Sequence, residues 1–112
     1  MEIRKVGTTD EFDTLTEEWR TLQVYTFGPL EDVEENEDAQ VLVALVDGQA
    51  AAYLIADDTD LWHIETRDGF TGNGYAKQLV QAANIRYAYE VCSDMGAEFC
   101  ESLGIEFDDC RE

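Results

Sequence analysis

A glycine-containing segment from Thr71 to Ala76, which reads TGNGYA, has the composition of an anion-binding loop. It follows a predicted strand and opens a predicted helix. The first N–H groups of a helix are unpaired and lie at the positive end of its dipole, so they attract phosphate, and glycines let the backbone approach the anion closely. An ordinary strand-to-helix turn explains the two glycines equally well. A dinucleotide fingerprint would need glycine at Lys77, and the Gly-Lys-Ser/Thr of a Walker loop is missing.

The cysteines and the one histidine do not have the spacing of a metal site. Cys92, Cys100 and Cys110 contain no C-x-x-C element, and His63 is the only histidine. An odd number of cysteines also does not form a disulfide framework. We therefore expect reduced thiols and no bound metal.

The composition predicts a single folded domain, residues 1–112, with an acidic surface. The net charge is −19, yet 45% of the residues are hydrophobic, which is enough for a core. Seven basic residues beside 26 acidic ones argue against nucleic-acid binding as the function, because affinity for phosphates comes from Lys and Arg. No apolar run is long enough to span a membrane, and the first residues lack the apolar region of a secretory signal. The chain is thus expected to be cytoplasmic.

The excess of acidic residues favours an origin in a salt-accumulating halophile. High net charge destabilises a compact protein by self-repulsion, and the Debye length of roughly 3 Å at molar salt removes most of that repulsion. The alternative is an acidic protein from a mesophile. Equal stability in dilute buffer and in concentrated KCl would favour that alternative.

The hydrophobic pattern places these residues on a mixed set of helices and strands. Thr8 and Glu11 have capping-box spacing, which predicts a helix from about Thr9 to about Gln23. Asp47-Gly48 between two apolar runs predicts a β-hairpin, and the run before it has the composition of a strand covered on both faces. The predicted strands of this half are residues 1–6, 41–46, 49–56 and 61–66, with a loop or short helix over 31–38.

The second half of the chain allows two interpretations. Residues 85–92 alternate as a strand does, but Ile85, Tyr89 and Cys92 also fit one long helix that continues from the glycine loop. Ser93 or Asp94 is placed to cap a last helix that ends at Leu103, and residues 105–107 are predicted as a closing strand. We favour the strand, which gives the order βα–βββ–α–β–α–β.

Two segments together resemble the GNAT acetyltransferase superfamily. Residues 61–80, LWHIETRDGFTGNGYAKQLV, resemble its acetyl-CoA-binding segment, in which a strand leads to Arg/Gln-x-x-Gly-x-Gly/Ala at a helix start. Gly74 and Ala76 match, while Thr71 stands where Arg or Gln is usual. Residues 89–107, YEVCSDMGAEFCESLGIEF, resemble the fifth strand, the following helix and the closing Glu-x-Leu-Gly stretch.

The resemblance implies an α/β (α+β) fold, a mostly antiparallel sheet flanked by helices on both faces. Only five residues follow Phe107, so the family's last strand is expected to be missing. The strand edge exposed in this way would suit a homodimer.

The resemblance also implies acetyl-CoA as the acyl donor. Thr66, at the end of its strand, would pair through its main chain with the pantetheine arm, and Lys77 or Arg67 could add positive charge; each is otherwise a solvated surface cation. The backbone that would cradle the pyrophosphate belongs to Gly72, Asn73, Gly74, Tyr75 and Ala76.

Catalysis in this family needs a base for the attacking amine and an acid for the leaving thiolate. Glu90 resembles the base of ribosomal-protein-type N-terminal acetyltransferases, and its alternative is a structural glutamate at a sheet edge. Cys100 stands where the family has the tyrosine that acts as general acid. The alternative interpretation of Cys100 is a small buried hydrophobic side chain. Asp60 and Glu65 are weaker candidates that would act through water. His63 is interpreted as a packed strand residue.

Three functions follow from these observations. The first is an N-acetyltransferase acting on a primary amine; the acidic surface would attract cationic acceptors such as polyamines, lysines or peptide amino termini. The second is a catalytically silent module that binds acetyl-CoA or a protein partner, which Cys100 and Thr71 favour. The third is an α/β protein whose glycine loop is only a turn.

Overall fold

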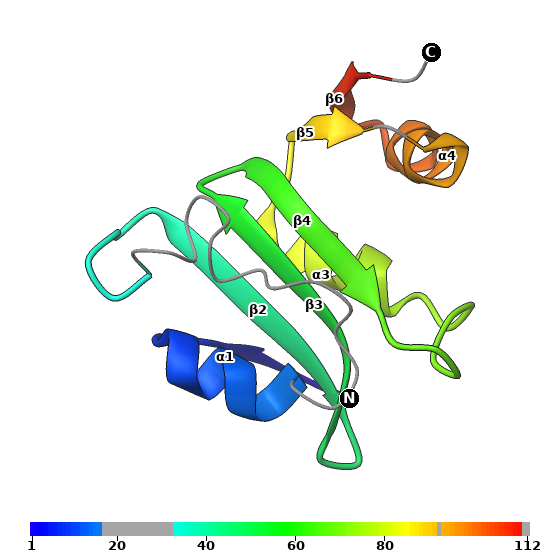
Figure 1. The fold of residues 1–112 in the computed structure, drawn as a ribbon. Helices are drawn as coiled ribbons and strands as arrows, with labels where there is room; N and C mark the ends of the chain where they lie inside the picture. The colour runs from blue at the N-terminus through cyan, green and yellow to red at the C-terminus, as the bar shows by residue number, and fades with distance from the viewer. Residues whose placement is uncertain (17–32, 92, 111–112) are drawn as a thin grey trace.

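The computed structural model describes residues 1–16, 33–91 and 93–110 and contains a six-stranded sheet in the order β1-β2-β3-β4-β5-β6 (Figure 1). The first four strands are antiparallel neighbours, whereas β4–β5 and β5–β6 are parallel. The elements in chain order are β1 (Glu2–Lys5), α1 (Thr9–Thr16), β2 (Ala39–Val46), β3 (Gln49–Asp57), β4 (Asp60–Thr66), α3 (Tyr75–Ala83), β5 (Tyr87–Val91), α4 (Asp94–Leu103) and β6 (Glu106–Asp109). This confirms the predicted mixed, mostly antiparallel sheet and the predicted element order.

The β2–β3 hairpin lies at the centre of the fold. Its turn residues Asp47 and Gly48 have φ values of 51° and 81°, the left-handed conformation that a two-residue hairpin turn requires. Asp-Gly supplies that conformation at low cost, because glycine has no Cβ and aspartate tolerates a positive φ. The predicted hairpin is therefore confirmed.

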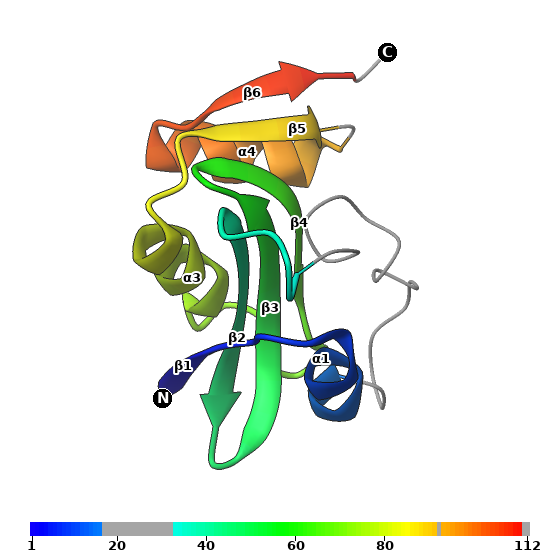
Figure 2. The same ribbon diagram turned by 90° about the vertical axis from the view of Figure 1, so that its left-hand side faces the viewer.

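Helices cover both faces of this hairpin, as its continuous apolar runs predict. Figure 2 shows α3 on one side of the sheet and α1 on the other. Leu54 packs in the core on the α3 side with Leu79, while Tyr53 packs in the core on the α1 side, where its ring meets Phe12 edge-on at 4.9 Å between centroids. The central residues of the hairpin are therefore buried on both faces of the sheet.

The helix ends have the caps that the sequence predicts. The Thr8 side chain accepts a hydrogen bond of 3.0 Å from the Glu11 N–H at the start of α1. Ser93 caps α4 in the same way, by accepting from the Gly96 N–H at 3.0 Å, and Gly104 ends α4 at φ 70°. The predicted part of the first helix beyond Thr16 lies outside the described residues.

The alternating residues after α3 form the strand β5, so the alternative of one long helix is wrong. β5 runs parallel to β4, with Tyr87 opposite Asp60, and β6 runs parallel to β5, with Glu106 opposite Tyr87. β6 lies at the edge of the sheet. That a second copy of the chain covers this edge stays a prediction.

The expectation that all three cysteines are reduced thiols is wrong. Cys100 is free and buried, but Cys110 is disulfide-bonded, and its partner lies outside the described residues. The Cys110 N–H donates to the Val91 carbonyl at 3.0 Å, so the chain after β6 lies beside the end of β5. Sequence spacing did not reveal this proximity. No helix among the described residues is long and apolar enough to cross a membrane.

Candidate functional site

The glycine loop leads into an α3 helix whose first turn is open. Gly74 is the N-cap of α3 at φ 78°, and Gly72 precedes it at φ 81°, both in the left-handed region that favours glycine. Gly74 has no side chain to cap the helix, so the N–H groups of the first turn remain available to a ligand. A helix start of this kind attracts an anion.

Side chains of the loop hold its conformation. The Asn73 side-chain amide donates to the carbonyls of Phe70 at 3.0 Å and Thr71 at 3.4 Å, so this side chain shapes the loop. Phe70 contacts the Tyr75 ring, with 6.3 Å between centroids, and the Arg67 guanidinium lies 5.9 Å from the Phe70 centroid. Arg67 thus packs against the loop itself.

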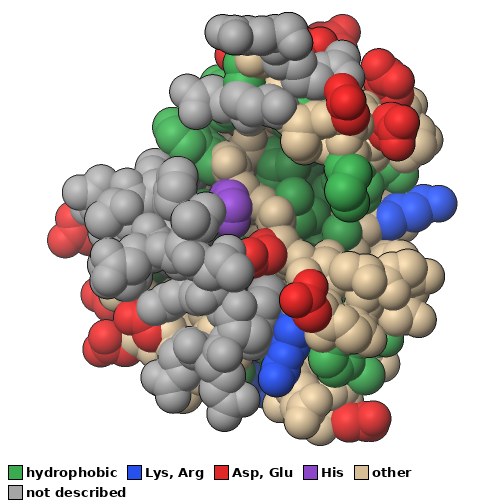
Figure 3. Space-filling model, turned by 45° about the vertical axis from the view of Figure 1, so that its right-hand side comes forward, with side chains coloured by type: hydrophobic (Ala, Val, Ile, Leu, Met, Phe, Trp, Pro, Cys, Tyr) green, Lys and Arg blue, Asp and Glu red, His purple; other side chains and the backbone are tan. Residues whose placement is uncertain are grey.

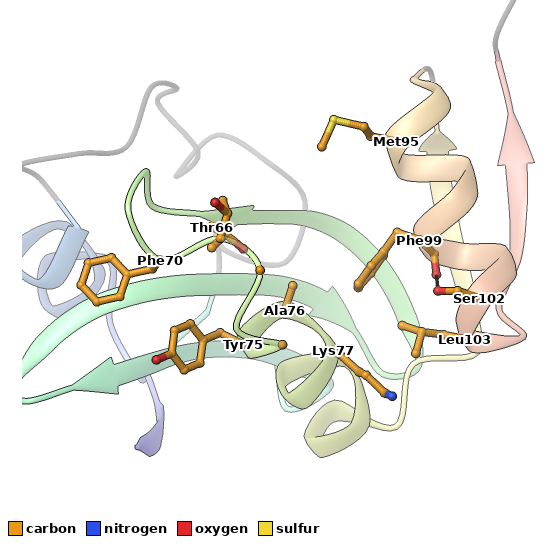
Figure 4. Close-up of a pocket in the computed structure, with 12 residues that line it drawn as sticks. Thr66, Phe70, Tyr75, Ala76, Lys77, Met95, Phe99, Ser102 and Leu103 are labelled. Carbon is orange, nitrogen blue, oxygen red and sulfur yellow. Dashed lines mark hydrogen bonds between the residues drawn. The ribbon is translucent and has the colours of Figure 1, made fainter.

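A cavity of about 430 Å³ separates this loop from α4 (Figure 4). It brings together most of the residues predicted to bind the acyl donor; of these, Asn73 and the alternative cation Arg67 are absent from the lining. Its walls are Thr66, Phe70, Thr71, Gly72, Gly74, Tyr75, Ala76 and Lys77 on one side and Met95, Phe99, Ser102 and Leu103 on the other.

The α4 wall of this cavity is a feature that sequence analysis missed. Met95, Phe99 and Leu103 are spaced four residues apart and form one apolar stripe, and Figure 4 shows Phe99 and Leu103 extending from α4 toward the loop. Met95 is 82% exposed, which is unusual for so large an apolar side chain. Helical spacing could have identified the stripe but not the surface that it faces.

A gap between β4 and β5 forms a second cavity next to the first. The two parallel strands pair at only two positions, Asp60 with Tyr87 and Leu61 with Ala88. β4 also has a bulge, because Ile55 pairs with His63 and Ala56 pairs with Leu61, which leaves Trp62 as the extra residue. Beyond this point the edge of β4 that faces β5 has no strand partner among the described residues.

The second cavity has a volume of about 250 Å³ and contains the side chains with acid–base chemistry. Phe99 lines both cavities, so they adjoin at its ring. Figure 3 shows apolar side chains in the hollow of this face and the histidine beside it. The lining consists of Leu61, Trp62, His63 and Ile64 of β4, Ala88, Tyr89 and Val91 of β5, and Ser93, Gly96, Phe99 and Cys100 at α4.

Cys100 is in this second cavity, and Glu90 is on the adjoining strand. The Cys100 side chain is 2% exposed, and its burial, together with the charge of Glu101, raises the pKa of its thiol. The thiol is therefore protonated at neutral pH, the form that a proton donor needs. Glu90 belongs to β5 beside the cavity-lining Tyr89, but its side chain lies outside what the structure describes.

The two weaker carboxylate candidates each accept a hydrogen bond from a tyrosine. Glu65 accepts from the Tyr53 hydroxyl at 2.8 Å, and Asp60 accepts from the Tyr89 hydroxyl at 3.2 Å. Neither carboxylate lines the second cavity. Neither is therefore placed to take a proton from an amine inside that cavity.

His63 is the titratable residue of the second cavity that sequence analysis did not select. Its ring packs against Tyr53, with 5.6 Å between centroids, and also lines the cavity. Burial lowers the pKa of His63, and the charge of Glu65 opposes that effect only in part. The imidazole is therefore neutral at pH 7 and is able to accept a proton. Strand periodicity predicted its packing but not its access to a cavity.

Comparison with known proteins identifies the fold. No family model and no curated protein sequence matches the chain. Among solved structures, the aminoglycoside 6′-N-acetyltransferase AAC(6′)-IG from Acinetobacter haemolyticus is similar, with a TM-score of 0.68, 19% identity and coverage of 95% of this chain and 91% of that one. AAC(6′)-Iy in complex with CoA has a TM-score of 0.68, 20% identity and coverage of 94% and 87%.

A ribosomal-protein-alanine N-acetyltransferase from Brucella melitensis biovar Abortus 2308 is also similar, with a TM-score of 0.62 and 19% identity, and the match covers 91% of this chain and 89% of that one. At these identities the likeness concerns the fold, and it extends over nearly the whole of each chain. The chain therefore has the GNAT acetyltransferase fold, as its sequence resemblance predicted.

Proposed function

We propose that this protein is an acetyl-CoA-dependent N-acetyltransferase that acts on a primary amine. The observation that carries the proposal is the pair of adjoining cavities, one at an open helix start and one in the gap between β4 and β5. One accepts the anionic part of a long, thin ligand, and the other accepts its reactive end. The structure of AAC(6′)-Iy in complex with CoA supports this choice of donor.

The first cavity matches the chemistry of the nucleotide end of acetyl-CoA. The N–H groups from Gly72 to Ala76 would bind the pyrophosphate, and the Lys77 ammonium would add a positive charge in a chain with few such groups. The apolar stripe of α4 would pack along the pantetheine arm. Contact with this arm would cover the exposed side chain of Met95.

The part of β4 that borders the gap matches the amide groups of the pantetheine arm. On its other side β4 pairs with β3, as in the register of Thr66 with Ala52. An extended ligand that carries amides can add to the edge of a strand as another strand does. This arrangement would direct the thioester from the loop, past Phe99, into the gap between β4 and β5.

The reaction needs no covalent enzyme intermediate. The nitrogen lone pair of a neutral amine attacks the thioester carbonyl carbon, a tetrahedral intermediate forms, and the C–S bond breaks to give an amide and CoA thiolate. A base takes the proton that the nitrogen loses, and an acid protonates the thiolate. We propose Glu90 as the base, with His63 as the second candidate, and the protonated thiol of Cys100 as the acid.

A catalytically silent acetyl-CoA-binding module is the second candidate function. It is favoured by Cys100, because the buried thiol with its raised pKa replaces the tyrosine expected from the resemblance. Both candidate functions require the first cavity to bind acetyl-CoA. They differ in whether an added amine releases free CoA thiol.

Titration calorimetry with acetyl-CoA in about 2 M KCl tests the shared step, because that salt screens the acidic surface. We expect a micromolar Kd. No binding by demonstrably folded protein would refute both functions.

A free-thiol assay over a panel of amines then separates the two functions. If the enzyme is active, Glu90→Gln is expected to lower kcat at least 100-fold, since a general base contributes about that much. His63→Gln is the comparison. Full activity of Glu90→Gln together with loss in His63→Gln would assign the base to His63.

A further inference from the structure

An aromatic pair stands at the open side of the gap between β4 and β5. Trp62 and Tyr89 are each 39% exposed, and their ring centroids are 5.1 Å apart with an interplanar angle of 49°. Tyr87 meets Tyr89 edge-on, with 5.2 Å between centroids. Large aromatic surfaces are normally buried, so packing in the core does not explain this exposed pair.

The bulge in β4 is what brings the two rings together. Trp62 is the extra residue of the bulge, so its side chain leaves the regular alternation of the strand at the point where β4 and β5 separate. Tyr89 lies one residue beyond the last position at which β5 pairs with β4. Both side chains line the second cavity, so the pair is part of the wall that an acceptor would contact.

The electrostatic surroundings of the pair are negative. The Tyr89 hydroxyl donates to the Asp60 carboxylate at 3.2 Å, and the charges of Asp60 and, more weakly, Asp57 raise the pKa of Tyr89. The whole chain carries a net charge of −19. An aromatic face next to carboxylates attracts cations, since the ring quadrupole and the carboxylate charge act in the same direction.

We propose that the Trp62–Tyr89 pair, with Asp60, binds a second positively charged group of the acceptor, which makes di- and polyamines the preferred substrate class. This inference rests on the proposed acetyltransferase function. The amine that reacts must be neutral in the gap, whereas the other amine stays protonated and lies against the rings. A monoamine or an acidic peptide would make no such contact.

Matched pairs of acceptors test the proposal. Acetyl transfer is measured with α,ω-diaminoalkanes of increasing length and with the 1-aminoalkane of the same length, at one fixed salt concentration. We expect the diamine to have at least a tenfold higher kcat/KM at the optimal length, which is the range of a partly desolvated cation–π contact. Equal values for diamines and monoamines at every length would overturn the proposal.

Substitutions at Trp62 separate the aromatic ring from simple bulk. Trp62→Leu is expected to reduce the ratio of diamine to monoamine kcat/KM to about one, while Trp62→Phe keeps most of it because a ring remains. Asp60→Asn is expected to lower the ratio about threefold by removing the neighbouring charge. A ratio that is unchanged in Trp62→Leu would refute the role of the pair.

A binding readout keeps this test distinct from that of the proposed function. Titration of the wild type with the best diamine should change its tryptophan fluorescence. Trp62→Phe should abolish this change, because Trp19 is then the one tryptophan left in the sequence and it does not belong to the proposed cation site. A saturable change with no acetyl transfer to any amine would refute the enzyme function but keep the cation site. Transfer to monoamines without any fluorescence response would refute the site alone.

Discussion

Replacement of Gly74 by alanine tests the anion-binding loop most directly. Gly74 has φ 78° and caps α3, and a Cβ built there meets no protein atom within 4 Å. The substitution therefore creates no clash within the protein. Alanine in the left-handed region is strained, which destabilises the folded state. Alanine also makes the unfolded chain less flexible, which favours folding, so the net loss of stability is about 1 kcal/mol.

Gly48 offers a matched control for that strain. It has φ 81°, a Cβ there also meets nothing within 4 Å, and it lines neither cavity of the site. An entropy of unfolding of about 2.1 cal/mol/K per residue over 112 residues converts 1 kcal/mol into a Tm decrease of about 4 °C. Gly74→Ala and Gly48→Ala should therefore melt at similar temperatures, both slightly below the wild type.

Only Gly74→Ala should weaken acetyl-CoA binding. Its new methyl group occupies the open space from which a pyrophosphate would approach the first turn of α3, and the loss of one charge-assisted hydrogen bond costs about 1.5–3 kcal/mol. We expect at least a tenfold higher Kd by calorimetry, with Gly48→Ala within twofold of the wild type. Equal Kd values for the two variants would refute the assignment of the loop.

Three further results are expected. Because the net charge is −19, Tm should rise between about 0.1 and 2 M KCl, and a Tm independent of KCl would contradict the halophile prediction. Since the folded pKa of His63 is lowered below 6.5, its neutral form stabilises the fold above that pH, and this stability is lost as the pH falls toward the folded pKa. Urea titrations at pH 7 and 5.5 should thus show a larger loss for the wild type than for His63→Gln; equal losses would show that His63 is not the cause. The buried thiol of Cys100, with its raised pKa, should resist alkylation at pH 8 in folded protein and react fully in urea, as checked by peptide mass spectrometry. Rapid labelling of Cys100 in the folded state would contradict its burial.

Features that depend on a few neighbouring residues could be predicted from the sequence. Asp47-Gly48 adopts its turn because both residues tolerate a positive φ, and Thr8 and Ser93 begin helices because their side chains satisfy free N–H groups. The glycine loop was found for the same reason. Its conformation depends on residues that are adjacent in the chain.

Features that depend on a distant partner were ambiguous or wrong. The alternating residues of β5 favoured a strand, but their spacing also allowed a helix, and the pairing of Tyr87 with Asp60 and Glu106 selects the strand. The disulfide of Cys110 was missed, since the approach of its backbone to Val91 depends on how β6 lies along β5. Spacing along the chain contains no information on such approaches.

The fold class, the order of the elements and the position of the glycine loop could be predicted from the sequence alone, because hydrophobic periodicity and capping residues act locally. Which surface lies opposite that loop depends on the packing of α4 and could be learned only from the three-dimensional structure. The β4 bulge at Trp62 and the early separation of β5 create the gap into which His63 and Cys100 open. Periodicity tells which face of an element is apolar, but the surface that this face meets is set by strand register and helix packing, which involve residues far apart in the chain.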